Sequence, residues 1–534
     1  MKRLALVVLS LMLVMGLSVV AYAGPGSVVI KTDGDITAKF GAQVRMIPTY
    51  EENWDFGIRT RTGNTGFVTH ANEAGLVNQG YIRTEDRLYF NFAKGDIWDV
   101  YFAIEFDDVA TSRTVDRVVA VEGDFASFGL ERLNASIKLP WIYSRLNAGW
   151  DVYTVDLDAG SLVYTDDDAG FSIVGGVANI DWKFGYHKVT ESNRRIALPD
   201  VTGGAVVVNT VTNTGYDNDR DIYSTRINYT LFKDTKIGLI YALNDMKLRG
   251  NTSTNDPCGL VGGGANTFCQ NVNAHYIGPI FVGSIAGFKI AAQYVHMFGE
   301  AERMLVLGDK FDIDSNAFFG DIAYDMTPMF GFRFIPHIGV LWAQGDDNPT
   351  DNKLEGYVGA KNFQRFIPSF GGENTIIADG NPVVGTFLYS FIPDLRGNQN
   401  NTLVVGGQGA GRGDNPGILL IGGGITVDPI KNWSYRTNAY YMEYNENFCV
   451  SAVAGACPAT ASGAPNLITK HEIGVAWDNE VSWWLDKNMV VKGQVSFLFP
   501  GDGTRQITRA LANTAGVQPD ETAIRLALEL LWNF

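Results

Sequence analysis

Residues 36–46 read ITAKFGAQVRM, and this stretch alternates strictly between apolar and polar side chains. Every even position from Ile36 to Met46 is apolar, whereas the odd positions hold threonine, lysine, glycine, glutamine and arginine. A period of two places successive side chains on opposite faces of a β-strand. The stretch therefore predicts a strand with one apolar and one polar face.

The same alternation returns along the whole chain, in residues 98–107, 332–342 and 524–534. Runs of about ten residues match the length that a tilted strand needs to cross the hydrocarbon of a membrane. A soluble β-sandwich would have shorter strands and more even loops. The pattern therefore favours transmembrane strands.

The connections between these strands alternate between short and long, which is typical of an up-and-down barrel. Short links lie near residues 95, 140, 179, 234, 287, 328, 431 and 487. Longer polar stretches separate them, most clearly 49–80, 191–219, 248–273, 344–415, 447–469 and 500–521. We predict an all-β, transmembrane, antiparallel up-and-down β-barrel of about 18 strands, with both termini in the periplasm. The ambiguous stretches 155–164 and 344–415 extend the range to roughly 16–20 strands.

The first 23 residues have the features of a cleaved signal peptide. A basic start at residues 2–3 precedes an apolar run over 4–20, and residues 21–23 read AYA, a small-residue cleavage site. An uncleaved anchor helix is the alternative, but no basic stop-transfer cluster follows. We expect residues 24–534 to form a single barrel domain in the outer membrane of a Gram-negative bacterium.

The composition disfavours several kinds of function. The net charge of −16 disfavours nucleic acid as a partner. The six histidines are scattered, and no G-x-S-x-G, HExxH or C-x-x-C-H motif occurs, so we expect no enzymatic activity, no metal and no cofactor. Acidic runs such as 166–168, 217–221 and 346–347 are expected to be solvated loops. A Ca²⁺ site is the alternative for these runs, although none has EF-hand spacing.

The four cysteines form two close pairs in polar, Gly-rich segments, Cys258 with Cys269 and Cys449 with Cys457. Four cysteines allow three connectivities. In an oxidising compartment we expect a disulfide within each segment. No pair has C-x-x-C spacing, which disfavours a metal site.

The polar faces of the strands provide the candidate lumen residues. A sheet in lipid must close on itself, because no backbone polar group can stay unpaired there. The polar set then faces an interior that is wide enough for an aqueous channel in a barrel of this size. The mid-strand arginines predict an interior that favours anions, whereas the alternative for each is a wall residue paired across the strands. The candidates are Arg45, Arg87, Arg132, Arg145, Arg226, Arg333, Arg436 and Arg525.

The stretch 344–415 is the candidate constriction. It combines Arg365, Arg396 and Arg412 with several phenylalanines and two Gly-Gly pairs. Loops this long often carry a function, and the apolar residues favour a loop that folds into the lumen. An outward cap or a contact between subunits of a trimer is the alternative.

The last strand, residues 524–534, ends in Phe534 and carries aliphatic and aromatic residues at alternate positions. In this it resembles the C-terminal strand of bacterial outer-membrane porins, which serves as their assembly signal. The resemblance implies a passive barrel channel, and it implies that Leu530, Trp532 and Phe534 form the assembly signal.

Two shorter segments resemble alginate-export-type porins more narrowly. They are residues 87–99, which include RLYF and GDIWD, and residues 471–501, which include HEIG, DKNM and FPG. This resemblance implies a monomeric barrel with a basic lumen for an anionic polysaccharide. It does not extend to individual substrate-binding residues.

Three classes of function follow from these observations. The first is an outer-membrane porin for passive passage of small hydrophilic, anion-leaning solutes. The second is a barrel with a dedicated cargo, either an exporter of an anionic polysaccharide or a sheath for a partner cytochrome in an electron conduit. The third is an outer-membrane enzyme, which the missing catalytic motifs disfavour. The expected partners are outer-membrane lipid, the barrel assembly machinery and small solutes, with a homotrimer as one assembly.

Overall fold

The computed structural model describes most of the strand-forming chain. It describes residues 28–31, 35–53, 78–111, 129–156, 162–190, 200–202, 205–207, 219–247, 269–303, 310–348, 351, 353–362, 415–449, 463, 466–511 and 520–534. Residues 1–23, Arg365, Arg396, Arg412, Cys258 and Cys457 lie outside the described residues. The signal peptide, the placement of these three arginines and both disulfides therefore stay predictions.

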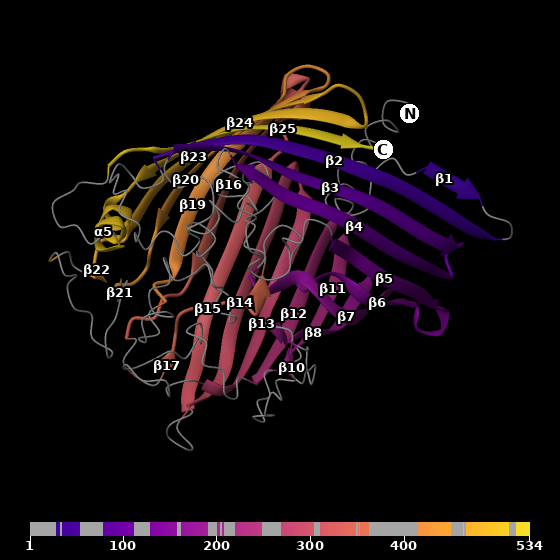
Figure 1. Cartoon of the computed structure of the whole chain (residues 1–534), viewed down its shortest axis with the longest axis horizontal. Coiled ribbons are helices and arrows are strands. Elements are labelled where there is room, and N and C mark those ends of the chain that lie inside the picture. The colour runs from indigo at the N-terminus through magenta and orange to yellow at the C-terminus, as the bar shows by residue number, and fades with distance from the viewer. Residues whose placement is uncertain are drawn as a thin grey trace.

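Eighteen long strands form one closed antiparallel sheet (Figure 1). They are β2 (Ile36–Glu52), β3 (Asn78–Lys94), β4 (Trp98–Thr111), β5 (Gly129–Leu139), β6 (Ser144–Thr154), β7 (Tyr164–Val177), β8 (Ile180–Thr190), β11 (Arg220–Phe232), β12 (Thr235–Lys247), β13 (Cys269–Ile285), β14 (Phe288–Arg303), β15 (Lys310–Tyr324), β16 (Arg333–Ala343), β19 (Ile418–Asp428), β20 (Trp433–Glu443), β23 (Glu472–Trp484), β24 (Met489–Pro500) and β25 (Ala523–Asn533). The last strand pairs with the first, with Val44 opposite Trp532. The predicted up-and-down barrel is confirmed.

The remaining elements are short. They are β1 (Val28–Lys31), β9 (Asp200–Thr202), β10 (Ala205–Val207), β17 (Lys353–Leu354), β18 (Lys361–Asn362), β21 (Phe448–Cys449), β22 (Leu467–Ile468), the 3₁₀ turn η1 (Pro140–Ile142), α2 (Thr327–Phe330) and α5 (Asp502–Leu511). No helix among the described residues is long and apolar enough to span a membrane.

The two ends of the barrel differ in their connections. All eight predicted short links join strands at the same end, where Ala178, Asp234 and Asn432 adopt left-handed φ angles of 52°, 62° and 68° that reverse the chain within a few residues. The last strand also ends there, because Ala42 and Phe534 exchange main-chain hydrogen bonds of 2.8 and 2.9 Å. Short turns mark the periplasmic end of outer-membrane barrels.

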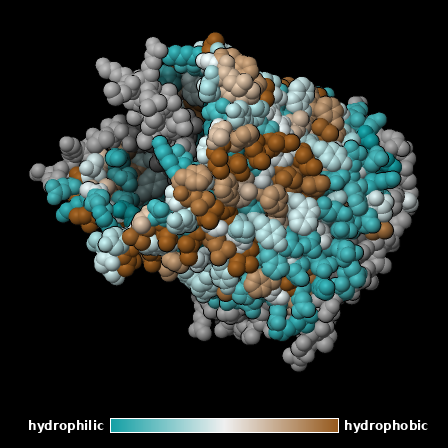
Figure 2. Space-filling model, turned by 180° about the vertical axis from the view of Figure 1, so that it is seen from behind, coloured by the Kyte–Doolittle hydropathy of each residue, from teal (hydrophilic) through white to brown (hydrophobic). Residues whose placement is uncertain are grey.

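The outward face of the barrel is apolar. Phe40, Val44 and Met46 from the opening stretch are exposed, whereas Arg45 between them is buried. Figure 2 shows hydrophobic residues gathered over a broad stretch of the outer surface, with hydrophilic residues on either side. A closed sheet with an apolar outer face satisfies its own backbone and presents hydrocarbon to lipid. The protein is therefore an outer-membrane barrel.

The interior is not polar throughout, which corrects the expectation of a wet, charged lumen. Toward the extracellular end of β11–β20, the inward side chains are apolar and buried, for example Ile240, Met297 and Leu420. They pack with Leu162 and Tyr357 from connections that fold inside the barrel. The sequence pattern missed this because both faces of these strands are apolar, so alternation no longer separates the faces.

Several predicted loops contain ordered structure. Strand β2 continues to Glu52 and β3 begins at Asn78, so the predicted loop 49–80 is shorter at both ends. The region 500–521 contains α5, whose Thr504 donates to the Ile473 carbonyl of β23. The helix is only ten residues long and holds only three apolar residues besides glycine, and the sequence analysis therefore read it as loop.

The acidic run 166–168 lies in β7 rather than in a solvated loop. Asp168 accepts a hydrogen bond of 2.9 Å from the Tyr164 hydroxyl, and Asp167 pairs with Arg132 at 2.9 Å. These polar partners inside the barrel allow a strand with three consecutive carboxylates. Of the ambiguous stretch before it, residues 155–156 and 162–163 are described; they lie inside the barrel and outside any strand.

Candidate solute path

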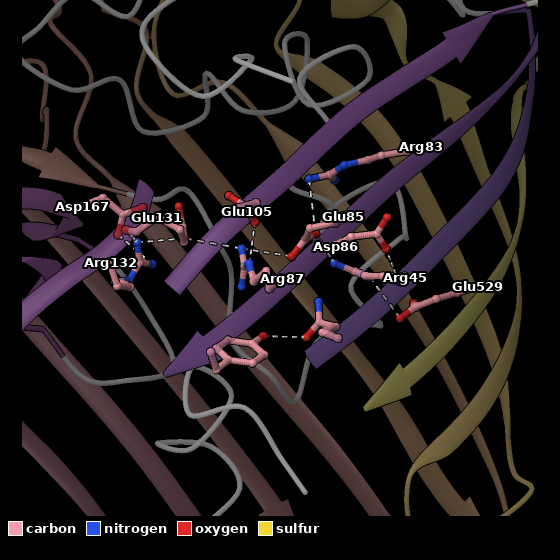
Figure 3. A network of polar contacts seen from close by, with 12 residues as sticks. Arg45, Arg83, Glu85, Asp86, Arg87, Glu105, Glu131, Arg132, Asp167 and Glu529 are labelled. Atoms are coloured by element: carbon pink, nitrogen blue, oxygen red, sulfur yellow. Dashed lines mark hydrogen bonds and ion pairs between the residues drawn. The ribbon is translucent and has the colours of Figure 1, made fainter. Parts of the chain in front are cut away.

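A chain of ion pairs runs along the inner wall of the barrel (Figure 3). At one end Arg45 on β2 contacts Glu529 on β25 (Nε to Oε1, 3.2 Å) and Glu85 on β3 (Nη1 to Oε2, 2.6 Å). The first and last long strands meet here, so the ion pair with Glu529 crosses the closure of the barrel. Arg45 therefore links three strands through its guanidinium group.

Arg87 on β3 and Arg132 on β5 continue this chain toward β7. Their carboxylate partners are Glu85 (3.0 Å from Arg87), Glu105, Glu131 (3.4 Å from Arg87 and 2.8 Å from Arg132) and Asp167 (2.9 Å from Arg132). The side chains of Arg45, Arg87 and Arg132 are only 10%, 14% and 3% exposed. They are paired across the strands, as the wall alternative describes, and present little surface to water.

Two further arginines lie on the wall between β20 and β25. Arg525 is 2% exposed and stands opposite Ser496 of β24 in the strand register. Arg436 is half-buried and stands opposite Glu480 of β23. These two arginines also belong to the wall rather than to an open water surface.

The other predicted arginines lie nearer the short-turn end and are more exposed. Arg145 on β6 pairs with Asp99, and Arg333 on β16 pairs with Asp428 at 3.3 Å. Arg226 on β11 stands opposite Lys183 of β8 and donates a 2.7 Å hydrogen bond to the carbonyl of Asp156. The eight predicted positions therefore divide into a buried group and a more exposed group.

Lysines from the polar faces of the strands accompany this exposed group. Lys138 pairs with Asp96, Lys236 with Asp181 at 2.7 Å, and Lys289 with Asp325 at 3.8 Å. The hydrogen bond from Lys138 and its charge lower the pKa of Asp96 in the β3–β4 turn. Of these three lysines, Lys138 next to the short link at residue 140 is the one that sequence reasoning missed.

We call this set the periplasmic arc, and it spans the inner wall from the β3–β4 turn to β19. It holds seven basic and five acidic side chains: Lys138, Arg145, Lys183, Arg226, Lys236, Lys289 and Arg333, with Asp96, Asp99, Asp181, Asp325 and Asp428. The cations of its five ion pairs are 31–47% exposed, several times more than the buried arginines. The arc is therefore the charged inner surface that water and solutes reach.

Residues 353–362, the inward segment, lie inside the barrel at the start of the predicted constriction. Its strand β17 pairs in parallel with β15, and β18 pairs in parallel with β7, so the segment reaches from one part of the wall to another. Tyr357, Val358 and Ala360 are buried. Wall side chains hold its carbonyls: Tyr276 binds Val358 (3.2 Å), Ser315 binds Glu355 (2.5 Å) and Arg220 binds Ala360.

Three carboxylates gather at the start of the inward segment. Asp346, Asp347 and Glu355 each bring one oxygen within 4.8 Å of the others. Burial raises the pKa of Asp346 to about 7, although hydrogen bonds from the main-chain N–H groups of Glu355 and Asn348 lower it. Asp346 is thus buried and not solvated as expected, and main-chain hydrogen bonds account for its position.

Comparison with known proteins assigns no role to any residue. No family model and no curated protein matches the sequence, so the narrower resemblance to alginate-export-type porins rests on the quoted segments alone. OccK9 (OpdG) of Pseudomonas aeruginosa is 11% identical, with 93% of this chain and 98% of that chain covered and a TM-score of 0.44. A BenF-like porin from Pseudomonas fluorescens Pf-5 is 10% identical, with 93% and 99% covered and a TM-score of 0.43.

A third solved structure is Wzi of Escherichia coli, described as a carbohydrate-binding β-barrel involved in group 1 capsule assembly. It is 12% identical, with 91% of this chain and 83% of that chain covered and a TM-score of 0.43. These similarities concern the barrel architecture only. The closed sheet of eighteen strands, the apolar outer face and the charged inner arc together define an outer-membrane barrel of the porin type.

Proposed function

We propose that the protein is a passive, non-enzymatic channel for small hydrophilic solutes, with a weak preference for anions, and that the inward segment narrows its lumen. The observation that carries the proposal is the periplasmic arc, a water-exposed and net basic surface inside a closed membrane barrel. Basic residues that line a pore favour anions. The preference is weak because every cation of the five ion pairs faces a carboxylate.

The buried arginines do not contribute to this preference. Their charges are neutralised by Glu85, Glu529 and the other carboxylates of the ion-pair chain, and their side chains meet little water. The selectivity expected from the sequence is therefore assigned to Arg145, Arg333 and the lysines of the arc. The barrel assembly machinery and a homotrimer remain proposals from the sequence.

The inward segment also bears on the alternative of a sheath around a partner cytochrome. Tyr357 and Leu162 pack on the inner wall and occupy space that an enclosed protein would need. The structure therefore favours solute passage beside the inward segment over enclosure of a partner. No feature of the described residues favours the polysaccharide exporter over the porin.

Reversal potentials across a planar bilayer under a salt gradient test the proposal. The wild-type protein should be slightly more permeable to Cl⁻ than to K⁺. The triple variant Lys236→Glu, Lys289→Glu and Arg333→Glu should fold and become cation-selective, because these side chains are solvated. Lys310→Glu, on the outer surface, is the control and should keep the wild-type value. Unchanged selectivity in the triple variant would refute the role of the arc.

A further inference from the structure

Two connections fold inside the barrel, and hydrogen bonds join them to each other. The first is the β6–β7 connection, of which residues 155–156 and 162–163 are described. The second is the inward segment. The Tyr357 hydroxyl donates to the Leu162 carbonyl at 2.9 Å, and the Ala360 N–H donates to the Val163 carbonyl at 2.8 Å. The β6–β7 connection therefore forms a support under the inward segment.

Asp156 holds this support together and is fully buried. Its carboxylate accepts hydrogen bonds from the main-chain N–H groups of Val163 (2.9 Å) and Tyr164 (2.6 Å), which closes the connection on itself. The same carboxylate accepts a hydrogen bond from the side-chain amide of Gln293 on β14. Its carbonyl accepts the hydrogen bond from Arg226 on β11. One residue thus joins the connection to two strands of the wall.

We propose that Asp156 is the positioning residue of the constriction: it fixes the β6–β7 connection to the wall, and this connection holds the inward segment in the lumen. The inference rests on the proposed channel function. It adds a residue that the sequence does not single out, since Asp156 lies between strands in a stretch without a motif. Asp156 acts through the inward segment and does not itself contact solute.

Loss of the Asp156 carboxylate should loosen the constriction without opening the barrel. In Asp156→Ala the N–H groups of Val163 and Tyr164 lose a buried acceptor. A buried donor that is left unpaired disfavours the state that buries it, here by roughly tenfold or more in the equilibrium constant. The inward segment is then held in the lumen (docked) less often and is free of it (released) more often. The ratio of released to docked molecules should rise by that factor. Single-channel records should then visit a level of higher conductance more often than the wild type does.

The protonation of Asp156 gives a second, independent expectation. Burial raises the pKa of Asp156 to about 7, although its hydrogen bonds lower it. The docked state therefore holds the proton more tightly than the released state, in which a solvated Asp has a pKa of about 4. Docking is then most stable below about pH 4 and weakens as the pH rises toward 7. The higher-conductance level should be visited more often at pH 8 than at pH 5.

The groups that face Asp156 do not reverse this expectation. Arg226 on β11 stays protonated across the range, and Gln293 on β14 is uncharged. Tyr164 of β7 and Tyr357 of the inward segment also lie near it, and burial raises the pKa of Tyr357 well above its usual value. Asp156 is therefore the group among these whose charge changes between pH 5 and pH 8.

The experiment compares Asp156→Ala, Asp156→Asn and Gln293→Met with the wild type in planar bilayers at pH 5 and pH 8. Heat-modifiable migration on gels confirms for each that the barrel is folded. Asp156→Ala should raise the occupancy of the higher level. Asp156→Asn should weaken the pH dependence, of which Asp346 beside the inward segment supplies the remainder. It should retain part of the docking, because one amide oxygen still accepts. Gln293→Met should also raise the occupancy of the higher-conductance level, because it removes the side chain of the wall that donates to Asp156.

Asp314→Ala, at an exposed outward carboxylate, is the control and should keep wild-type behaviour. If Asp156→Ala does not fold, Asp156→Asn and Gln293→Met decide the question. The role of Asp156 would be overturned if both of these variants visited the higher-conductance level as often as the wild type does, with the same dependence on pH. A wild-type barrel that is folded but never conducts would instead overturn the proposed channel function, so the two failures are distinguishable.

Discussion

Arg45 lies between carboxylates of two neighbouring strands, and its removal would leave Glu529 buried with Lys492 as the basic partner 3.2 Å away. Breaking a buried ion pair is costly because the remaining charge stays out of water. We expect Arg45→Met to lower the free energy of unfolding by about 3 kcal/mol, measured by urea titration in lipid vesicles.

The matched control for Arg45 is Arg333→Met, which removes a more exposed ion pair at the short-turn end. Exposed pairs contribute roughly 0–1 kcal/mol, so the midpoint of unfolding should move little. Equal effects of the two substitutions would contradict the division between buried and exposed arginines.

Substitutions at two neighbouring residues test which face of the strand each side chain occupies. Val44 is exposed on the outer face, and Gln43 next to it faces inward. An arginine near the midplane of the lipid costs roughly 2–4 kcal/mol, and a shift of one residue changes the face. Val44→Arg should therefore reduce the fraction of folded barrel on heat-modifiability gels, whereas Gln43→Arg should be tolerated. Equal tolerance of both would contradict the assignment of faces.

At the scale of elements, the closure of the barrel depends on the last strand. The two main-chain hydrogen bonds between Ala42 and Phe534 complete the pairing of β25 with β2. Deletion of Phe534 should lower outer-membrane levels, because an unpaired strand edge in lipid is unfavourable. Phe534→Tyr keeps the main chain and the ring and should assemble normally. Normal levels of the deletion variant would contradict this role.

The elements differ in how far their sequence predicts them. Strict alternation, as in residues 36–46, predicted the strands and their faces because a period of two is a local property. The pair between Arg45 and Glu529 could not be predicted, since 484 positions separate the partners and only closure brings them together. The inward segment was anticipated as part of a loop, but its hydrogen bonds to Tyr276 and Arg220 depend on the curvature of the whole wall.

Alternation predicts the face of each exposed arginine and lysine, but it does not predict which of these side chains come together. Lys236 and Lys289 lie next to the short links of two different hairpins. Their common location emerges only when the turns of β11–β12 and β13–β14 come to one end of the barrel. The selectivity of the candidate path is thus a property of topology more than of any one strand.

At the scale of the whole molecule, a closed membrane barrel contains two unlike halves. The extracellular part of β11–β20 is filled by apolar packing against the inward segment, while the periplasmic arc remains in contact with water. Passive conduction requires a continuous aqueous path past the inward segment. This path is what separates a channel from a barrel whose interior is sealed.

Single-channel conductance of the folded protein in a planar bilayer tests this requirement most directly. Protein whose folding has been verified by heat-modifiable migration should insert and give discrete, ohmic current steps in KCl. Heat-denatured protein is the control and should give no steps. Repeated insertion of folded barrels without any conductance would contradict the central claim, because it would mean that the inward segment and the apolar packing close the lumen completely.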